Sequence, residues 1–373
     1  MSIFAIRCER LQKIICDEGV ELALITNPIN VTYLTGFSGD ASNLIVTPTK
    51  TLLVSDGRFK VQIEEECPGL EAFIRGPARL TVDVTIEQMK SFSPRSIGIE
   101  SGHLTMADFD TFKEGIKTAD WKLASDRVEK LRMIKDDTEV AQIRSAIRIA
   151  ERAFAMFRAC LKPSDTEVDM GHAMESFIRQ AGGSESAFPV IAAVGPRSAL
   201  PHAPPSLSAM QEHRLLLVDW GASGPFYKSD LTRILWTYNN LQFPNGCAIP
   251  DKVRNVHAVV KEAQRRAIAA MRPGASTKEI DTIARGYIAD QGFGELFNHG
   301  LGHGFGLQIH EPPFFRPSVD VTLAAGMVVT CEPGIYLQGE FGIRIEDDIL
   351  ITPDGAEILT HCPRELDASI VEF

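Results

Sequence analysis

Short apolar runs alternate with stretches of helical spacing along roughly the first 125 residues. Apolar residues recur at helical intervals over 5–19, where Gly19 would end a helix, and helical spacing returns over 57–65. Strands are predicted where apolar runs stand between turn residues, at 22–26, 43–46, 51–54 and 96–100. This alternation predicts an α/β domain.

A charged segment with few apolar residues, 126–139, follows, and we place the domain boundary there, which gives domains 1–128 and 129–373. Thr138 is expected to cap a long helix over 139–161 whose apolar residues form one stripe. Three more helices are predicted at 170–180, 252–271 and 277–291. Strands are predicted at 191–194, 215–218, 234–237, 327–332 and 342–351. Two helices precede each of two strand pairs, which indicates an α+β domain with two similar halves.

Carboxylates stand at the ends of the first strand pair. Asp219 follows the apolar run 215–218, and Asp230 comes after Gly224-Pro225, which can reverse the chain. Antiparallel strands would bring both carboxylates to one cleft. Taken alone, the pair also fits a turn aspartate and a helix-capping aspartate.

The second strand pair is more informative. Glu332 ends an apolar run, and Pro333-Gly334 then breaks the strand. Alternation of side chains along 342–351 puts Arg344 and Glu346 on one face. A glutamate on an inward face needs a partner, which is either Arg344 in a buried ion pair or a metal ion.

Two histidines lie in a glycine-rich segment between the acidic pairs. His299 and His303 have the i, i+4 spacing of a zincin helix, but four glycines within 300–306 would disrupt a helix and no glutamate follows His299. The segment is therefore not an HExxH protease motif. An extended, glycine-rich chain would instead present one imidazole as a ligand, with the other as its support.

Four carboxylates and one imidazole form a ligand set for a pair of divalent metal ions. Cations would offset the large cost of burying unpaired carboxylates. This ligand set favours Mn, Co, Fe or Zn over copper or a thiolate-bound metal. The leading interpretation is a two-metal hydrolase.

Composition and charge narrow the class of protein. With 373 residues, of which 44% are hydrophobic and 23% charged, the chain suits two ordinary globular domains. A net charge of −11, without runs of Lys or Arg, argues against a nucleic-acid partner. The seven cysteines contain no CxxC pair, and we find neither a signal peptide nor a membrane-spanning apolar run. We therefore expect a cytoplasmic protein without a membrane partner.

Together these motifs resemble the pita-bread metallopeptidases, in particular the proline-specific branch of aminopeptidase P and prolidase. The resemblance covers the whole chain, because Val31-Thr-Tyr33-Leu34-Thr-Gly36-Phe37-Ser-Gly39 and Asp56-Gly57-Arg58 resemble a creatinase-like N-terminal domain. It implies a smaller α/β creatinase-like domain followed by a pita-bread catalytic domain. It also implies five ligands for two divalent ions, of which manganese is the first choice and Co, Fe or Zn are possible: Asp219, Asp230, His303, Glu332 and Glu346.

The resemblance further implies roles for individual residues. Asp230 and Glu346 would bridge the two ions, and Glu332 would also carry a proton to the leaving nitrogen. The catalytic set is completed by two histidines that hold substrate and move protons and by an arginine beside the bridging glutamate, namely His202, His310 and Arg344. Residues expected around the cleft are Tyr227, Thr232, His299 and Tyr336.

We therefore expect a dinuclear metal-dependent Xaa-Pro aminopeptidase that acts on proline-containing peptides as a cytoplasmic homodimer. The alternative is an Xaa-Pro dipeptidase (prolidase), which must recognise the proline carboxylate with a positive charge. Arg316 is the best candidate for that charge, although it could equally be a surface loop residue. A creatinase-type amidinohydrolase and a non-catalytic binding protein share this fold, but the presence of all five ligands argues against both.

Overall fold

The computed structural model describes residues 2–124, 126–238 and 248–373. The chain divides into two compact units, Met1–Arg132 and Met133–Phe373. The domain bounds 1–128 and 129–373 stay a prediction. None of the helices in the described ranges is long and apolar enough to cross a membrane.

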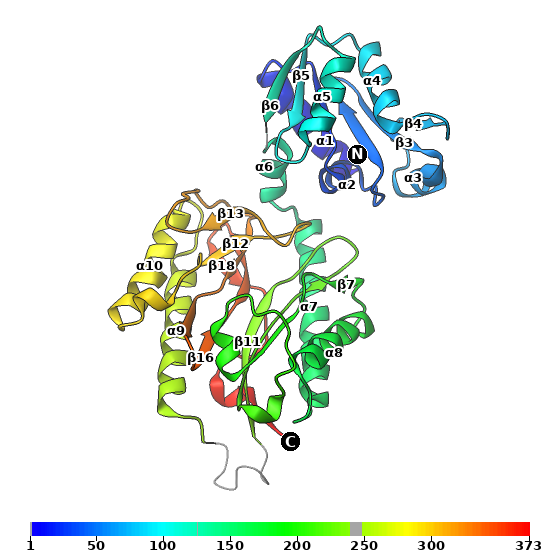
Figure 1. The fold of residues 1–373 in the computed structure, drawn as a ribbon. Coiled ribbons are helices and arrows are strands. Elements are labelled where there is room, and N and C mark those ends of the chain that lie inside the picture. The colour runs from blue at the N-terminus through cyan, green and yellow to red at the C-terminus, as the bar shows by residue number, and fades with distance from the viewer. Residues whose placement is uncertain (1, 125, 239–247) are drawn as a thin grey trace. The chain divides into compact units, whose positions relative to one another are not determined.

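The first unit is built on one six-stranded sheet (Figure 1). In the spatial order β4-β3-β2-β1-β5-β6, its strands are β4 (Ala72–Arg75), β3 (Thr51–Asp56), β2 (Ser42–Val46), β1 (Leu22–Ile25), β5 (Ser96–Glu100) and β6 (Asp120–Ala124). Its helices are α1 (Ile3–Asp17), α2 (Pro28–Thr35), α3 (Lys60–Glu66), α4 (Thr81–Ser91), α5 (Met106–Gly115) and α6 (Arg127–Met133). Strand β1 pairs antiparallel with β2 and parallel with β5. Apolar side chains of these strands and of α4 form the core.

In the described residues of the second unit, 133–238 and 248–373, four α-helices accompany several small sheets. The helices are α7 (Asp137–Cys160), α8 (Glu167–Gln180), α9 (Asp251–Ala270) and α10 (Thr277–Asp290). A four-stranded sheet has the order β19 (Ile370–Glu372), β11 (Leu231–Tyr238), β9 (Leu215–Trp220) and β8 (Ile191–Val194). A five-stranded sheet has the order β13 (Glu311–Phe315), β12 (Gly302–Gly304), β14 (Val328–Cys331), β17 (Asp347–Thr352) and β18 (Gly355–Ile358). Two-stranded pairs are β15 (Gly334–Leu337) with β16 (Phe341–Arg344), and β7 (Glu185–Ser186) with β10 (Ala222–Ser223).

Two hydrophobic cores lie on opposite faces of the four-stranded sheet. Along β9, Leu216 and Val218 pack with side chains of α7 and α8, whereas Leu215 and Leu217 pack with those of α9 and α10. The two helix pairs accordingly flank the strands in Figure 1. Because both faces are covered, the strand is apolar on both faces from Leu215 to Val218. This double burial explains why a carboxylate near its end, Asp219, is itself buried.

The helices and strands that the apolar pattern predicts in the second unit are present, with two corrections. Asp136, rather than Thr138, caps α7, because its carboxylate accepts from two backbone N–H groups of the first turn and Glu139 closes a capping box. The strand expected over 342–351 is two strands, β16 and β17, which separate at Ile345 and Glu346. In addition, the charged segment 126–139 contains helix α6, where Arg127, Val128 and Arg132 are buried.

Candidate metal centre

Strand register brings the acidic residues of distant segments to one place. Antiparallel pairing of β9 with β11 puts Asp219 opposite Thr232, and Thr232 also forms a β-bridge with Glu346. Asp230 directly precedes β11. Glu332 directly follows β14, whose last residue pairs with the residue after Glu346. The four carboxylates predicted from the sequence therefore meet where these strands end.

His303 lies at the centre of β12, in the glycine-rich segment. A Cβ atom at Gly302 or Gly304 would overlap a neighbouring backbone carbonyl, so these glycines permit the close strand packing. The Nδ1 atom of His303 lies 3.1 Å from its neighbour's carbonyl oxygen, Gly304 O. A carbonyl can only accept, so Nδ1 carries the hydrogen and Nε2 carries the lone pair.

The Nε2 lone pair of His303 faces two carboxylates. It lies 3.6 Å from Asp230 Oδ2 and 3.5 Å from Glu332 Oε1. Burial lowers the pKa of His303 to about 3, so the ring is neutral at neutral pH. Two carboxylates and a lone pair that face one another need either a shared proton or a cation between them. One ligand atom each of Asp230, His303 and Glu346 lies within 4.8 Å of the others.

The pKa values of the four carboxyl groups show how unfavourable it is to bury their charges together without a cation. Burial raises the pKa of Asp219, and burial together with neighbouring carboxylates raises those of Asp230 and Glu346 well above the ordinary range. Burial also raises the pKa of Glu332 to about 8. Glu332 keeps the largest exposed fraction of the four side chains, 17%. Oxygen-rich, negatively charged ligands with one imidazole fit divalent cations such as Mn.

Arg344 balances part of this negative charge. Its Nη2 atom lies 2.5 Å from Asp219 Oδ2, its Nε donates to Thr232 Oγ1, and its Nη1 donates to the Tyr336 hydroxyl. The same hydroxyl lies 2.8 Å from His299 Nε2. The other oxygen of Asp219, Oδ1, is buried and has no hydrogen-bond partner among the described residues. Arg344 therefore leaves one oxygen of Asp219 for a cation.

A cavity of about 750 Å³ opens onto these groups. The ligand candidates that line it are Asp219, Asp230, His303, Glu332 and Glu346. His202, His310 and Arg344 also line the cavity, as does His299. The His310 ring meets the His303 ring edge to face, with 4.5 Å between centroids. Tyr227, in contrast, donates its hydroxyl to Glu139 and is not among the described residues that line the cavity.

The sequence analysis did not identify two residues, Lys135 and Arg285, that contact the segments carrying the histidines of the cavity. Lys135 forms a buried ion pair with Glu311, the residue after His310, at 2.9 Å. Arg285 donates to the backbone carbonyl of His299. A lysine in a charged segment and an arginine on an amphipathic helix look like ordinary surface residues, so no sequence signal marked them.

The two halves of the chain match known families. Residues 141–353 match metallopeptidase family M24, and residues 7–134 match the creatinase/prolidase N-terminal domain. The chain belongs to metallopeptidase family M24. Membership agrees with the fold expected from the resemblance, a creatinase-like domain followed by a pita-bread catalytic domain.

Several Xaa-Pro peptidases are similar to this chain over nearly its whole length. An Xaa-Pro dipeptidase from Pyrococcus furiosus is 34% identical over 362 residues, which cover 96% of this chain and 99% of that protein. The solved structure of an Xaa-Pro dipeptidase from Bacillus anthracis has a TM-score of 0.91 at 33% identity and covers 99% of this chain and 100% of its own. That of an X-Pro aminopeptidase from Thermotoga maritima has a TM-score of 0.87 at 32% identity, with 98% and 100% covered.

Proposed function

We propose that the protein is a dinuclear metal-dependent Xaa-Pro dipeptidase, which releases the first residue from Xaa-Pro dipeptides. The observation that carries the proposal is the neutral imidazole of His303 between Asp230 and Glu332, in a cavity that Arg316 also lines. This reverses the preference for an aminopeptidase, because the relatives named above include dipeptidases that match over nearly their full length.

We assign the five ligands as the resemblance implied, with Asp230 and Glu346 shared by both ions. His303 and Glu332 would hold one ion, and the free Oδ1 of Asp219 would hold the other. When bound, two divalent ions would lower the pKa of water and polarise the scissile carbonyl. Manganese is our first choice, because carboxylate ligands dominate the site.

The protein's own groups would handle the proton and the substrate. Glu332 is the best-placed carrier of a proton from water to the leaving nitrogen, because its carboxylate is buried yet keeps contact with the cavity. His202 and His310 line the cavity outside the ligand set and would donate hydrogen bonds to the peptide. Arg344 would hold Asp219 in place rather than touch the substrate.

Arg316 would recognise the carboxylate of proline. It follows β13 and stands over the Phe314 ring, with 5.1 Å from its guanidinium carbon to the ring centroid. The surrounding wall of the cavity is apolar, with Phe188 and Ile191 among its residues, and suits a proline ring. A guanidinium at an apolar pocket can pair with a carboxylate in a bidentate manner.

The deciding experiment compares Xaa-Pro, Xaa-Pro amide and Xaa-Pro-Yaa as substrates of wild-type and Arg316→Gln proteins. We expect wild type to prefer the free dipeptide, and Arg316→Gln to lose roughly 10–100-fold in kcat/KM on that substrate alone. Arg272→Gln, a change at an exposed arginine, is the control. Faster cleavage of the tripeptide by wild type would support the aminopeptidase, the second candidate, which the likeness to the Thermotoga maritima structure favours.

Two finer expectations stay predictions. The homodimer and the cytoplasmic location rest on the sequence analysis above. Cys8, Cys16, Cys67, Cys160, Cys331 and Cys362 are free in the described part of the chain, which is consistent with a reducing compartment.

A further inference from the structure

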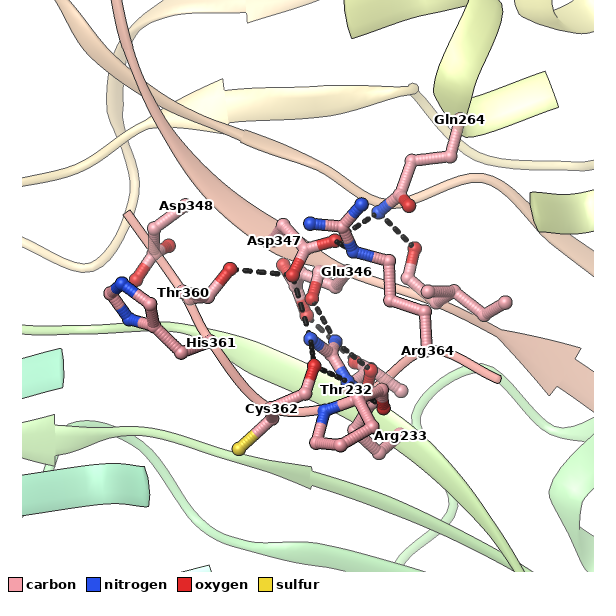
Figure 2. A network of polar contacts seen from close by, with 12 residues as sticks. Thr232, Arg233, Gln264, Glu346, Asp347, Asp348, Thr360, His361, Cys362 and Arg364 are labelled. Atoms are coloured by element: carbon pink, nitrogen blue, oxygen red, sulfur yellow. Dashed lines mark hydrogen bonds and ion pairs between the residues drawn. The ribbon is translucent and has the colours of Figure 1, made fainter. Parts of the chain in front are cut away.

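A buried polar network adjoins the metal centre through the backbone next to its glutamates (Figure 2). Its hub is Asp347, which is 0% exposed. One of its oxygens accepts from Arg233 Nη2 at 2.7 Å and from the Thr360 hydroxyl. The other accepts from Gln264 Nε2 at 2.9 Å and lies 2.6 Å from Arg364 Nε. Two cations and two neutral donors therefore converge on the Asp347 carboxylate. None of these four partners is a proposed metal ligand.

Gln264 connects this hub to both glutamate ligands. It lies on α9, is 1% exposed, and donates from Nε2 to Cys331 O at 2.9 Å and to Ile345 O at 3.1 Å. These two carbonyls belong to the peptide bonds Cys331–Glu332 and Ile345–Glu346. One side-chain amide therefore holds the peptide planes immediately before two ligands that are far apart in the sequence.

Arg233 fixes the other side of Glu346. Its Nη1 donates to Glu346 O and, at 2.9 Å, to Thr232 O. The same Thr232 carbonyl accepts from the Glu346 backbone N–H at 3.2 Å. Both backbone polar groups of Glu346 are thus tied to the start of β11, which directly follows Asp230. Backbone contacts therefore fix where Glu346 stands relative to the residue after Asp230, with which β11 begins.

The segment that follows β18 completes the network. Arg233 donates to Cys362 O at 2.7 Å and to Pro363 O at 3.1 Å, so the guanidinium spans from the metal centre to this segment. The half-buried Cys362 and the exposed Pro363 therefore contribute backbone acceptors to the buried guanidinium of Arg233.

We propose that Gln264, Asp347 and Arg233 form a positioning network that sets the separation of Glu332, Glu346 and Asp230 for two metal ions. The inference rests on the proposed dinuclear function. It follows from the contacts above, because ligand atoms must lie within a few tenths of an ångström of their ideal places, and a tilt of either peptide plane would move a carboxylate further than that. None of these three side chains is among the described residues that line the cavity, so the network would act on the ligands through the backbone.

The test uses Gln264→Met, which keeps the length of the side chain but removes its donors. Binding of Mn²⁺ and Co²⁺ is measured on the full chain by competition titration, together with the visible spectrum of the Co²⁺ form and the thermal stability. We expect metal affinity to fall roughly 10–100-fold and the Co²⁺ spectrum to change. Ile288→Ala removes a buried side chain of α10 from the same core and serves as a matched control for lost stability. It should leave affinity and spectrum unchanged.

Arg233→Lys is the second variant and keeps the charge but cannot reach Glu346 O, Asp347 and Cys362 O together. It should weaken metal binding in the same way. Wild-type metal affinity and spectrum in a folded Gln264→Met or Arg233→Lys protein would overturn the network's role. Failure of the wild-type protein to bind two ions would instead overturn the proposed function on which the inference rests.

Discussion

At the scale of single residues, protonation decides when the centre can take up cations. Burial raises the pKa of Glu332 to about 8, and burial together with neighbouring carboxylates raises those of Asp230 and Glu346 well above their ordinary range. Without cations Glu332 therefore holds a proton at neutral pH, whereas His303, with a pKa of about 3, holds none on Nε2. Divalent ions need deprotonated carboxylates, so metal binding must release protons.

Metal affinity should therefore fall as the pH drops below about 8, the pKa of Glu332, by roughly tenfold per pH unit for each proton released. Between the ordinary pKa of a glutamate and about 8, the folded metal-free protein binds more protons than the unfolded chain. Its stability should consequently decline as the pH rises through that window, and added Mn²⁺ should raise the melting temperature more at pH 8 than at pH 5. Calorimetric titration in buffers of different ionisation enthalpy checks the proton count. Binding enthalpies at pH 7 that do not depend on the buffer would contradict this account.

At the scale of elements, the loop that carries His202 is held by one buried carboxylate at the start of α8. Glu167 accepts from Val194 N at 2.8 Å, before the loop, and from Ser206 N at 2.9 Å, after it. It also accepts from Arg197 Nε at 2.7 Å within the loop. Both ends of the loop are therefore fixed at a single point, which restricts where His202 can stand in the cavity.

Glu167→Gln should lower kcat/KM for an Xaa-Pro dipeptide by roughly 10–100-fold, because the new amide hydrogens would face backbone and guanidinium donors and shift the loop. Metal content should stay at the wild-type level, since none of the proposed ligands lies in the loop. Glu175→Gln, at an exposed position of the same helix, is the control. Full activity of the Glu167→Gln protein would show that the position of the loop does not depend on Glu167. Loss of metal would show that the substitution disturbs the metal centre rather than the loop alone.

The pattern of apolar residues predicts most, but not all, of the helices and strands of the second unit correctly. The helices of the second unit follow from their 3.6-residue stripes, and the β9–β11 pair follows from carboxylates at the ends of apolar runs. The break at Glu346 was not predictable, because the alternation of Arg344 and Glu346 continues as in an unbroken strand. Helix α2 was missed for a related reason: it spans only eight residues, and buried residues on most of its surface leave no polar face to mark its period.

At the scale of the whole molecule, the ligands could be proposed from the sequence because the five residues together, in their order and spacing, resemble the ligand pattern of the family, although each motif alone is weak. The groups that hold them could not. Gln264 sits on an ordinary amphipathic helix, and only the packing of α9 against the strands shows that its amide reaches two peptide bonds. The preference between dipeptide and longer substrates was equally out of reach, because our proposal for it uses the position of Arg316, the residue after β13, which only the structure shows to line the cavity.

All five proposed ligands belong to the second unit, Met133–Phe373, while the first has its own sheet and core. Metal binding should therefore stabilise the two units unequally. At a Mn²⁺ concentration about 100 times its Kd, the second unit should gain roughly 2.7 kcal/mol against unfolding per bound ion. Hydrogen exchange of the full chain, with and without Mn²⁺, should show added protection in β9, β11, β14 and β17, and in α9 because Gln264 links it to both glutamates.

Residues 2–124 should exchange at the same rate in both conditions. A Glu346→Ala protein, in which a shared ligand is lost, serves as the control and should show no added protection anywhere. Equal gains of protection in both units would mean that metal binding is coupled to the first unit as well, and protection of the strands without α9 would show that the metal centre is not linked to that helix through the network.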